Sequence, residues 1–422
     1  MGVEARKSTR ADAVALTKAV VETHITDQCT LFARPEQDFR VDMLVNPGEE
    51  VAQGAPVLRS RRHPSLTLVA PVAGTVAGVD LGPGRRLSQV LFFHLPDGER
   101  HVHDVRAAEN GTNASATRSL LLSAGLWTYL RSRPFGRLPS PDETPAAIFV
   151  MALDTRPDAP PPALTLKGRL DAFARGLQAL VGLTSGPVHV CHDGTAGLGD
   201  IGGGNRIRLN RVEPVHPLGL PGMQIASRFP AATGKPVWDI HAEDAAGIGE
   251  FLATGLVPET RMVSVSGPAL REKRLVRCQP GADLRALTFD IVRPGPHRLM
   301  SGSALDGMEG RWLGSCDRQV AAIAAAGPER RPHWFSAALR RSSRPLPIIP
   351  TAALDHAFGG ILPAAPLVRA IAANDTETAI RLGALSLIEE DVALADYVTA
   401  ASPRLAVLLR GMLDWIADEE VS

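Results

Sequence analysis

The chain has 422 residues, of which 45% are apolar and 21% charged, and its 45 basic side chains balance 45 acidic ones. This composition is typical of globular proteins, and the length exceeds one ordinary core, so we expect three or four domains. A formal net charge of zero gives no reason to expect binding to nucleic acid or to an acidic surface.

The four cysteines, Cys29, Cys191, Cys278 and Cys316, lie far apart in the sequence. Without a CxxC pair, the sequence indicates neither an iron–sulfur cluster nor a zinc ribbon, and it favours a reducing compartment over a disulfide framework. The first 21 residues lack the apolar core of a signal peptide. No apolar run approaches about 18 residues, so we expect no membrane-spanning segment and membrane association only through a partner.

Residues 1–27 are predicted to form a leader segment with weak helical character, and residues 28–114 a barrel-sandwich domain of the biotinyl or lipoyl type. Strand-like runs alternate there with glycines at sharp corners, as in residues 46–58 and 68–76. Carrier domains of this type bear a lysine on the hairpin between their halves. The hairpin here, residues 59–65, contains three arginines and no lysine, and arginine cannot be acylated as lysine can. We therefore expect a structural or docking role rather than group carriage.

Residues 115–260 are predicted to form an α/β domain with a parallel sheet. The apolar runs 146–153 and 187–191 are typical of strands buried on both faces, and an amphipathic helix pattern, residues 170–183, separates them. Strand, helix and strand in this order indicate parallel pairing. Before them, residues 110–117 are interpreted as a linker and residues 120–130 as a helix that ends before Pro134.

The remaining chain is predicted to form a small mixed domain over residues 261–344 and a helical domain over residues 345–422. Candidate strands cover residues 262–267 and 288–292, and residues 345–350 indicate a stiff, proline-rich connection. In the last helix, Ser402 is the expected cap and Pro403 the first helical residue. Its apolar stripe consists of Leu405, Leu408, Leu409, Met412, Trp415 and Ile416. We expect this stripe to pack on its own domain; the alternative is a face for a partner protein.

No group of residues indicates an autonomous active site. Residues 197–202 match the dinucleotide fingerprint by letter, but a strand-like pattern follows where the fingerprint needs a helix, so a glycine-rich surface loop is favoured. The histidine groups His94, His101, His103 and His189, His192 lack a third ligand at a compelling spacing. Ser301 and Ser303 lack the context of a hydrolase nucleophile. We therefore predict no catalytic residue, metal ligand or cofactor-binding residue.

Arg131, Arg133 and Arg137 lie beside Phe135 at the predicted end of a helix. Such a group could contact a polar head group, a quinone carbonyl or an acidic partner surface. The alternative, slightly favoured by the pattern, is a solvated helix terminus at which cations interact favourably with the helix dipole.

A set of short motifs runs along nearly the whole chain in a specific order. The motifs are residues 63–65, 70–76, 127–135, 145–155, 216–220, 237–240, 299–303, 333–335, 374–379, 382–385 and 389–394. Together they resemble the A subunit of the sodium-translocating NADH:quinone oxidoreductase. The C subunit of the Rnf-type electron-transport complex shares the domain order, but it needs repeated CxxCxxC sets that this chain lacks.

The resemblance implies an α+β multidomain fold, with a barrel-sandwich, a Rossmann-like domain, a β-grasp (SLBB-like) domain at 261–344 and a helical domain. It implies a peripheral protein on the cytoplasmic face of the bacterial inner membrane, which binds no flavin or cluster of its own. NADH and flavin chemistry would belong to partner subunits, so the chain alone would not be catalytic. Contact with ubiquinone is expected at Arg131, Arg133, Pro134 and Phe135.

The chain also departs from the family pattern. Ala395 and Thr399 stand where the family usually carries cysteines, and the hairpin that is usually rich in lysine is rich in arginine. Two other functions therefore remain open. The chain could be a soluble oxidoreductase that binds a flavin or nicotinamide nucleotide, or a pure interaction module.

Overall fold

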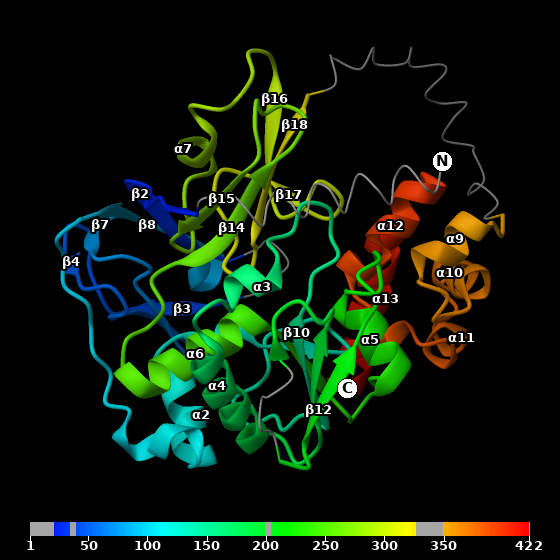
Figure 1. The fold of residues 1–422 in the computed structure, drawn as a ribbon, viewed down its shortest axis with the longest axis horizontal. Coiled ribbons are helices and arrows are strands. Elements are labelled where there is room, and N and C mark those ends of the chain that lie inside the picture. Colours follow the sequence, from blue (N-terminus) through cyan, green and yellow to red (C-terminus); the bar gives the residue numbers. More distant parts are fainter. Residues whose placement is uncertain (1–20, 34–38, 199–203, 326–348, 422) are drawn as a thin grey trace.

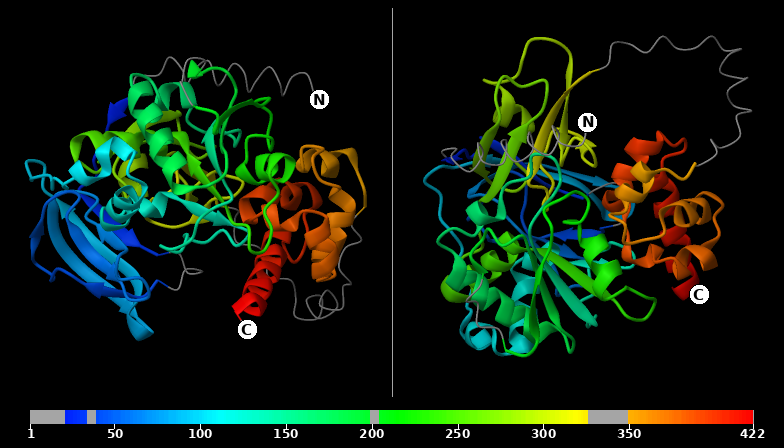
Figure 2. Two further views of the ribbon diagram at one scale, coloured as in Figure 1. Left: turned by 90° about the horizontal axis from the view of Figure 1, so that it is seen from below. Right: turned by 45° about the vertical axis from the view of Figure 1, so that its right-hand side comes forward.

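The computed structural model describes residues 21–33, 39–198, 204–325 and 349–421. Most of the predicted leader, part of the glycine-rich loop and residues 345–348 of the proline-rich connection lie outside these ranges. The described residues form four parts in the predicted order (Figure 1). The barrel-sandwich and the helical domain lie on opposite sides of the α/β domain, as Figures 1 and 2 both show.

The N-terminal domain is a barrel-sandwich made of two small antiparallel sheets. One sheet has the order β2-β8-β7-β4 and the other the order β3-β5-β6. The strands are β2 (Gln28–Phe32), β3 (Val41–Met43), β4 (Glu50–Val51), β5 (Pro56–Ser60), β6 (Thr67–Val69), β7 (Gly74–Gly82) and β8 (Arg86–His94). Alternate residues of both sheets face inward, so Val57, Val76 and Phe92 are buried in one core.

The hairpin between β5 and β6 is packed against the α/β domain. Leu66, at its end, is only 1% exposed and belongs to the apolar core of that neighbouring domain. The backbone approaches closely as well, since a Cβ atom on Gly125 would lie 3.3 Å from the carbonyl oxygen of Thr67. A swinging carrier arm needs a free hairpin. This hairpin instead has a structural role within the chain, because it holds the barrel-sandwich against the α/β domain.

The α/β domain is built on a five-stranded sheet of order β12-β11-β10-β13-β9. The strands are β9 (Arg131–Arg133), β10 (Ala147–Ala152), β11 (Val188–His192), β12 (Ile207–Arg211) and β13 (Val237–His241). Four strands are parallel, and β9 runs antiparallel to β13. The helices α4 (Leu170–Leu183) and α6 (Ala242–Thr254) cover one face, and α5 (Pro221–Arg228) covers the other. The buried strands predicted at 146–153 and 187–191 and the helix at 170–183 are confirmed.

Two predictions before this sheet are wrong. Residues 110–117 are not a linker, because η2 (Arg106–Gly111) leads into α2 (Ala114–Ser123), whose start is capped by Asn113. The helix predicted at 120–130 ends at Ser123, because Gly125 adopts a left-handed φ of 73°. A short turn, η3 (Leu126–Tyr129), then leads into β9, so Arg131 and Arg133 lie on a strand and not at a helix end.

In the described residues, the third part is a six-stranded sheet crossed by one short helix, as expected for a β-grasp domain. The sheet order is β1-β15-β14-β18-β16-β17. Its strands are β1 (Glu22–Thr23), β14 (Arg261–Ser266), β15 (Arg274–Cys278), β16 (His297–Ser301), β17 (Met308–Glu309) and β18 (Gln319–Ala324). α7 (Leu284–Thr288) packs its leucines on this sheet. The strand predicted at 288–292 is wrong, because α7, which is capped by Asp283, ends at Thr288 and residues 289–291 form a turn. Residues 22–23 of the predicted leader form a strand rather than a helix.

The C-terminal part is helical throughout its described length. It contains α9 (Ala352–Ala357), α10 (Ala364–Ala372), α11 (Thr376–Arg381), η5 (Ala384–Ser386), α12 (Glu389–Thr399) and α13 (Leu405–Val421). The cap predicted for Ser402 is wrong, because the Asp396 carboxylate of α12 accepts the amides of Leu405 and Ala406. Most of the predicted stripe packs on its own domain, but Trp415 is 47% exposed.

The close crossing of α4 and α6 provides a test of this packing. A Cβ atom on Gly176 would lie 1.8 Å from the carbonyl oxygen of Ala245, so the helices cannot keep their separation. We expect Gly176→Ala to lower the free energy of unfolding by about 1–3 kcal/mol in urea titrations. Gly182→Ala is the matched control on the same helix. Its Cβ would have ordinary contacts of 3.4 Å, and the gain in helix propensity should raise stability by up to about 1 kcal/mol. Equal losses in both variants would contradict the close crossing.

Candidate functional site

Arg131 and Arg133 of β9 both reach the carboxylate of Asp239 on the adjacent strand β13. Arg131 Nη2 donates to Asp239 Oδ1 at 2.7 Å, and Arg133 Nε donates to Asp239 Oδ2 at 3.1 Å. The Arg133 side chain is 0% exposed. A buried charge of this kind requires close partners of opposite sign. Asp239 of the same sheet is therefore the first of these partners.

The helical domain supplies the other partners, from the first turn of α12. Arg131 Nη2 donates to Glu390 Oε1 at 2.7 Å, and Arg133 Nη1 donates to Asp391 Oδ2 at 2.5 Å. Carboxylates are favourable in this position because the helix dipole is positive at its N-terminus. Asp391 also accepts the amides of Ile388 at 2.9 Å and Gly222 at 3.0 Å. The five charged residues Arg131, Arg133, Asp239, Glu390 and Asp391, here called the edge cluster, therefore join the two domains.

Glycine at position 222 is required by this arrangement. A Cβ atom there would lie 2.3 Å from the Asp391 carboxylate, closer than any side chain permits. The N-terminus of α5 is thus shaped to receive a side chain from another domain.

Arg156 extends the network to a third domain. It follows β10 and pairs with Asp154 at 2.7 Å, with Asp306 of the β-grasp domain at 3.4 Å and with Glu390 of the helical domain at 3.8 Å. This position lies beside the carboxyl ends of β10 and β13, where the strand order of the sheet reverses. Ligands of open α/β sheets bind in that crevice. Here a guanidinium group of the chain itself lies there and connects three domains.

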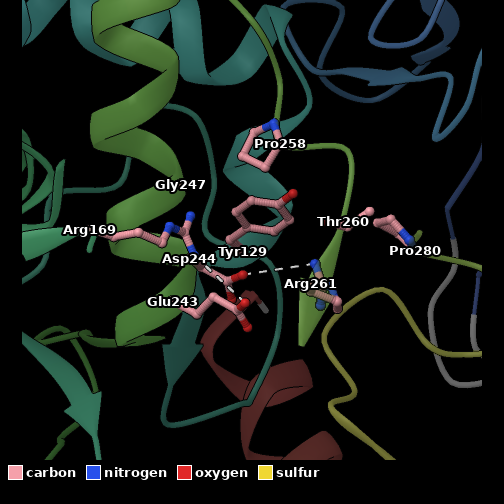
Figure 3. Close-up of a pocket in the computed structure, with 9 residues that line it drawn as sticks. All are labelled: Tyr129, Arg169, Glu243, Asp244, Gly247, Pro258, Thr260, Arg261 and Pro280. Atoms are coloured by element: carbon pink, nitrogen blue, oxygen red, sulfur yellow. Dashed lines mark ion pairs between the residues drawn. The ribbon is translucent and has the colours of Figure 1, made fainter. Parts of the chain in front are cut away.

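A second cluster of charges joins α6 to the β-grasp domain. Glu243 and Asp244 occupy the first turn of α6, and Arg318, which precedes β18, pairs with both, at 3.3 Å and 2.5 Å. Arg261 of β14 lies 3.8 Å from Asp244 (Figure 3). Nearby, burial and the charges of Arg318, Arg156 and Arg261 hold the pKa of His241 well below its ordinary value. His241 is therefore neutral, and its Nδ1 accepts the amide of Glu243.

A small cavity adjoins this second cluster, lined by Tyr129, Arg169, Glu243, Asp244, Gly247, Pro258, Thr260, Arg261 and Pro280 (Figure 3). Its volume of about 10 Å³ holds about one water molecule and is far too small for a quinone ring or a flavin. Nε and Nη1 of the buried Arg261 have no hydrogen-bond partner within the described structure, so a bound water would suit them. Burial raises the pKa of Tyr129 to about 12, so its hydroxyl stays protonated.

The other residues singled out from the sequence are engaged in local packing. Phe135 is half-buried against the helical core, and Pro134 beside it is buried. His189 stacks on Phe149 at 4.6 Å, and His103 Nε2 lies 3.0 Å from the carbonyl oxygen of Gly54. Across the described ranges, no group of three or more His, Cys, Asp or Glu side chains is arranged to hold a metal ion.

Sequence reasoning missed most of the network. Asp239, Glu390 and Asp391 lie within motifs of the family resemblance, but nothing local indicated an ionic role, because their arginine partners lie far away along the chain. Arg156 lies just outside those motifs. Two signals were present. Asp239 interrupts an apolar run, and three acidic residues, 389–391, open a helix.

Breaking the edge cluster should loosen the helical domain. We expect Arg133→Ala to cost about 3–5 kcal/mol, because Asp239 and Asp391 would be left buried without their shared cation. Hydrogen exchange of α12 and α13 should rise accordingly. Arg137→Ala is the control. Its pair with Asp414 at 3.0 Å is about half exposed, so the loss should stay below about 1 kcal/mol. Similar hydrogen exchange of α12 and α13 in both variants would contradict the role of Arg133 in holding the helical domain in place.

The edge cluster should also weaken in acid. Burial opposes ionisation of Glu390, but Arg131, Arg156 and Arg133 outweigh it and hold its pKa at about 2. The unfolded pKa is about 4.3, so this carboxylate stabilises the folded state above that pH and ceases to do so as the pH falls through about 2. Glu390→Gln removes the charge. The stability difference between the native chain and this variant should therefore shrink from pH 5 to pH 2 in urea titrations. A constant difference would contradict the paired state of Glu390.

Comparison with known proteins identifies the family. Three family models match, described as the NqrA N-terminal barrel-sandwich hybrid domain at residues 13–93, the NqrA second alpha/beta domain at 112–257 and the NQRA C-terminal domain at 262–310. A solved structure of an NAD⁺-reducing [NiFe]-hydrogenase aligns over 73% of this chain and 64% of its own, at 11% identity and a TM-score of 0.37, too low to support an argument. No helix within the described ranges is long and apolar enough to cross a membrane.

Similar curated proteins agree in name. The A subunit of the Na(+)-translocating NADH-quinone reductase from Shewanella amazonensis is 31% identical over 416 residues, covering 90% of this chain and 91% of its own. The protein of the same name from Rhodopirellula baltica is 32% identical over 413 residues, covering 89% of each chain. The chain belongs to the family of the A subunit of the Na(+)-translocating NADH-quinone reductase.

Proposed function

We propose that the chain is the peripheral A subunit of a bacterial membrane complex that passes electrons from NADH to quinone and exports Na⁺. The observation that carries the proposal is family membership along about nine-tenths of the chain. The protein would lie on the cytoplasmic face of the inner membrane and bind the membrane subunits. NADH oxidation and flavin chemistry would take place in those partners.

The contribution of this chain would be positional rather than catalytic. Three junctions support this role: the packed β5–β6 hairpin, the edge cluster, and the second cluster, in which Arg318 pairs with Glu243 and Asp244 of α6. Each fixes one domain against another through buried contacts. A protein with domains held in this way offers its partners a surface of constant shape.

Contact with ubiquinone at Arg131, Arg133, Pro134 and Phe135 remains a prediction. The guanidinium groups of Arg131 and Arg133 already have carboxylate partners, and Pro134 is buried. Phe135 is the half-buried member of the segment, and the guanidinium of Arg137 lies 5.6 Å from its ring centroid. We therefore propose that quinone contact in this segment would involve Phe135 and Arg137 rather than Arg131 and Arg133, which are paired with carboxylates.

Purification in the native host tests the assignment. A tagged full-length chain should recover the membrane subunits and quinone reductase activity from detergent-solubilised membranes, and Phe135→Ala should raise the KM for a ubiquinone analogue while recovery of the partners is unchanged. Recovery of the chain alone from the membrane-free fraction, with the visible absorbance of a stoichiometric flavin, would instead identify a soluble flavoprotein.

A further inference from the structure

Six arginines gather at one end of the barrel-sandwich domain, and we call this group the arginine patch: Arg40, Arg59, Arg61, Arg62, Arg85 and Arg86. They come from three segments that the sheets bring together. The amide of Arg61 donates to the carbonyl of Arg40 at 2.9 Å, Arg40 forms an isolated β-bridge with Arg86, and Arg85 Nε donates to the carbonyl of Val41 at 3.1 Å. Arg59 pairs in register with Asp42 across β3 and β5.

Four members of the patch, Arg59, Arg61, Arg62 and Arg85, carry more positive charge than Asp42 offsets, and Arg40 and Arg86 take part in other interactions. Asp42 is shared between Arg61 at 3.7 Å and Arg85 at 3.4 Å, whose side chains are 50% and 49% exposed. Arg59 and Arg62 are exposed and have no ion-pair partner among the described residues. The whole chain has no net charge, so this local excess is a real separation of charge on the molecule.

The chemistry of the patch fits a phosphate-bearing surface better than a protein interface. Protein interfaces have an apolar centre that is depleted of charge, whereas Arg59, Arg61 and Arg62 present exposed charges here. Guanidinium groups form bidentate hydrogen bonds with phosphate oxygens, and all six cations here are arginine. The packed side of the hairpin carries Leu66, while Arg61 and Arg62 remain exposed.

We propose that the arginine patch binds the anionic phospholipid headgroups of a bilayer. This inference rests on the proposed function, because a peripheral component of a membrane complex lies within reach of such a surface. Clusters of basic residues are attracted to anionic leaflets without any inserted segment. The patch would then orient the chain on the membrane independently of its protein partners.

Sedimentation of the full-length chain with vesicles tests the proposal. Vesicles of equal parts phosphatidylglycerol and phosphatidylcholine should bind the chain, and vesicles of phosphatidylcholine alone should not. Binding should fall by about tenfold or more as salt rises from about 50 mM to about 300 mM, since salt screens the attraction. Arg59→Gln with Arg62→Gln should weaken binding about 10- to 30-fold, because each arginine contributes to the attraction.

The matched control is Arg271→Gln with Arg298→Gln, two exposed arginines of the β-grasp domain, which should change binding less than about twofold. Circular dichroism checks that all variants fold. Absent or charge-independent vesicle binding, or equal loss in the control, would overturn the proposal. So would a patch variant that binds vesicles normally but no longer recovers the membrane subunits, because the patch would then serve an acidic protein surface. Recovery of the membrane subunits tests the proposed function separately, because the complex can assemble whether or not the isolated chain binds lipid.

Discussion

The buried guanidinium of Arg133 is the contact on which the arrangement of the domains depends. It has no exposed surface, and it is neutralised by Asp239 of its own sheet and by Asp391 of the helical domain. Moving a guanidinium out of water is costly, and its attraction to a carboxylate repays that cost only when the geometry is good and the remaining polar groups are paired. Here both conditions hold, because Arg133 also donates to the carbonyl of Ser386, and Asp391 also accepts two backbone amides. These contacts therefore fix the position of the helical domain against the α/β domain.

The same logic explains why the chain holds the framework of an electron-transfer protein in a fixed form. In a carrier domain the hairpin moves, whereas here Leu66 anchors it. In a nucleotide-binding sheet the crevice at the reversal of strand order receives a ligand, whereas here Arg156 lies there with three carboxylates. Both changes replace a moving or exchangeable part by a fixed contact within the chain. The proposed positional role requires this property.

Local pattern was enough to predict much of the fold. The continuous apolar runs at β10 and β11 and the amphipathic pattern of α4 identify the α/β domain, because burial on one or both faces leaves a period in the sequence. The prediction that Arg131 lies at a helix end was wrong, because its local sequence pattern does not reveal its distant partners. Charged residues on a strand look like a solvated terminus when their partners are unknown, and Glu390 lies 259 residues away. The single glycine at 125, whose left-handed backbone ends the helix, was the local sign that the helix stops early.

Buried and exposed charges have different roles in this molecule, although they cancel in the total. At the domain junctions each arginine faces carboxylates at close range, so these charges fix geometry and have little effect outside the protein. In the arginine patch, a single carboxylate, Asp42, is shared between Arg61 and Arg85. The positive electrostatic field of the exposed arginines therefore extends into solvent over roughly one Debye length, about 8 Å at physiological salt. The paired charges inside the molecule hold the domains in place, and the exposed arginines give one side of the surface a positive charge. The direction matters only for a protein that must meet a charged surface in one orientation, and a peripheral protein beside an anionic membrane is in that position.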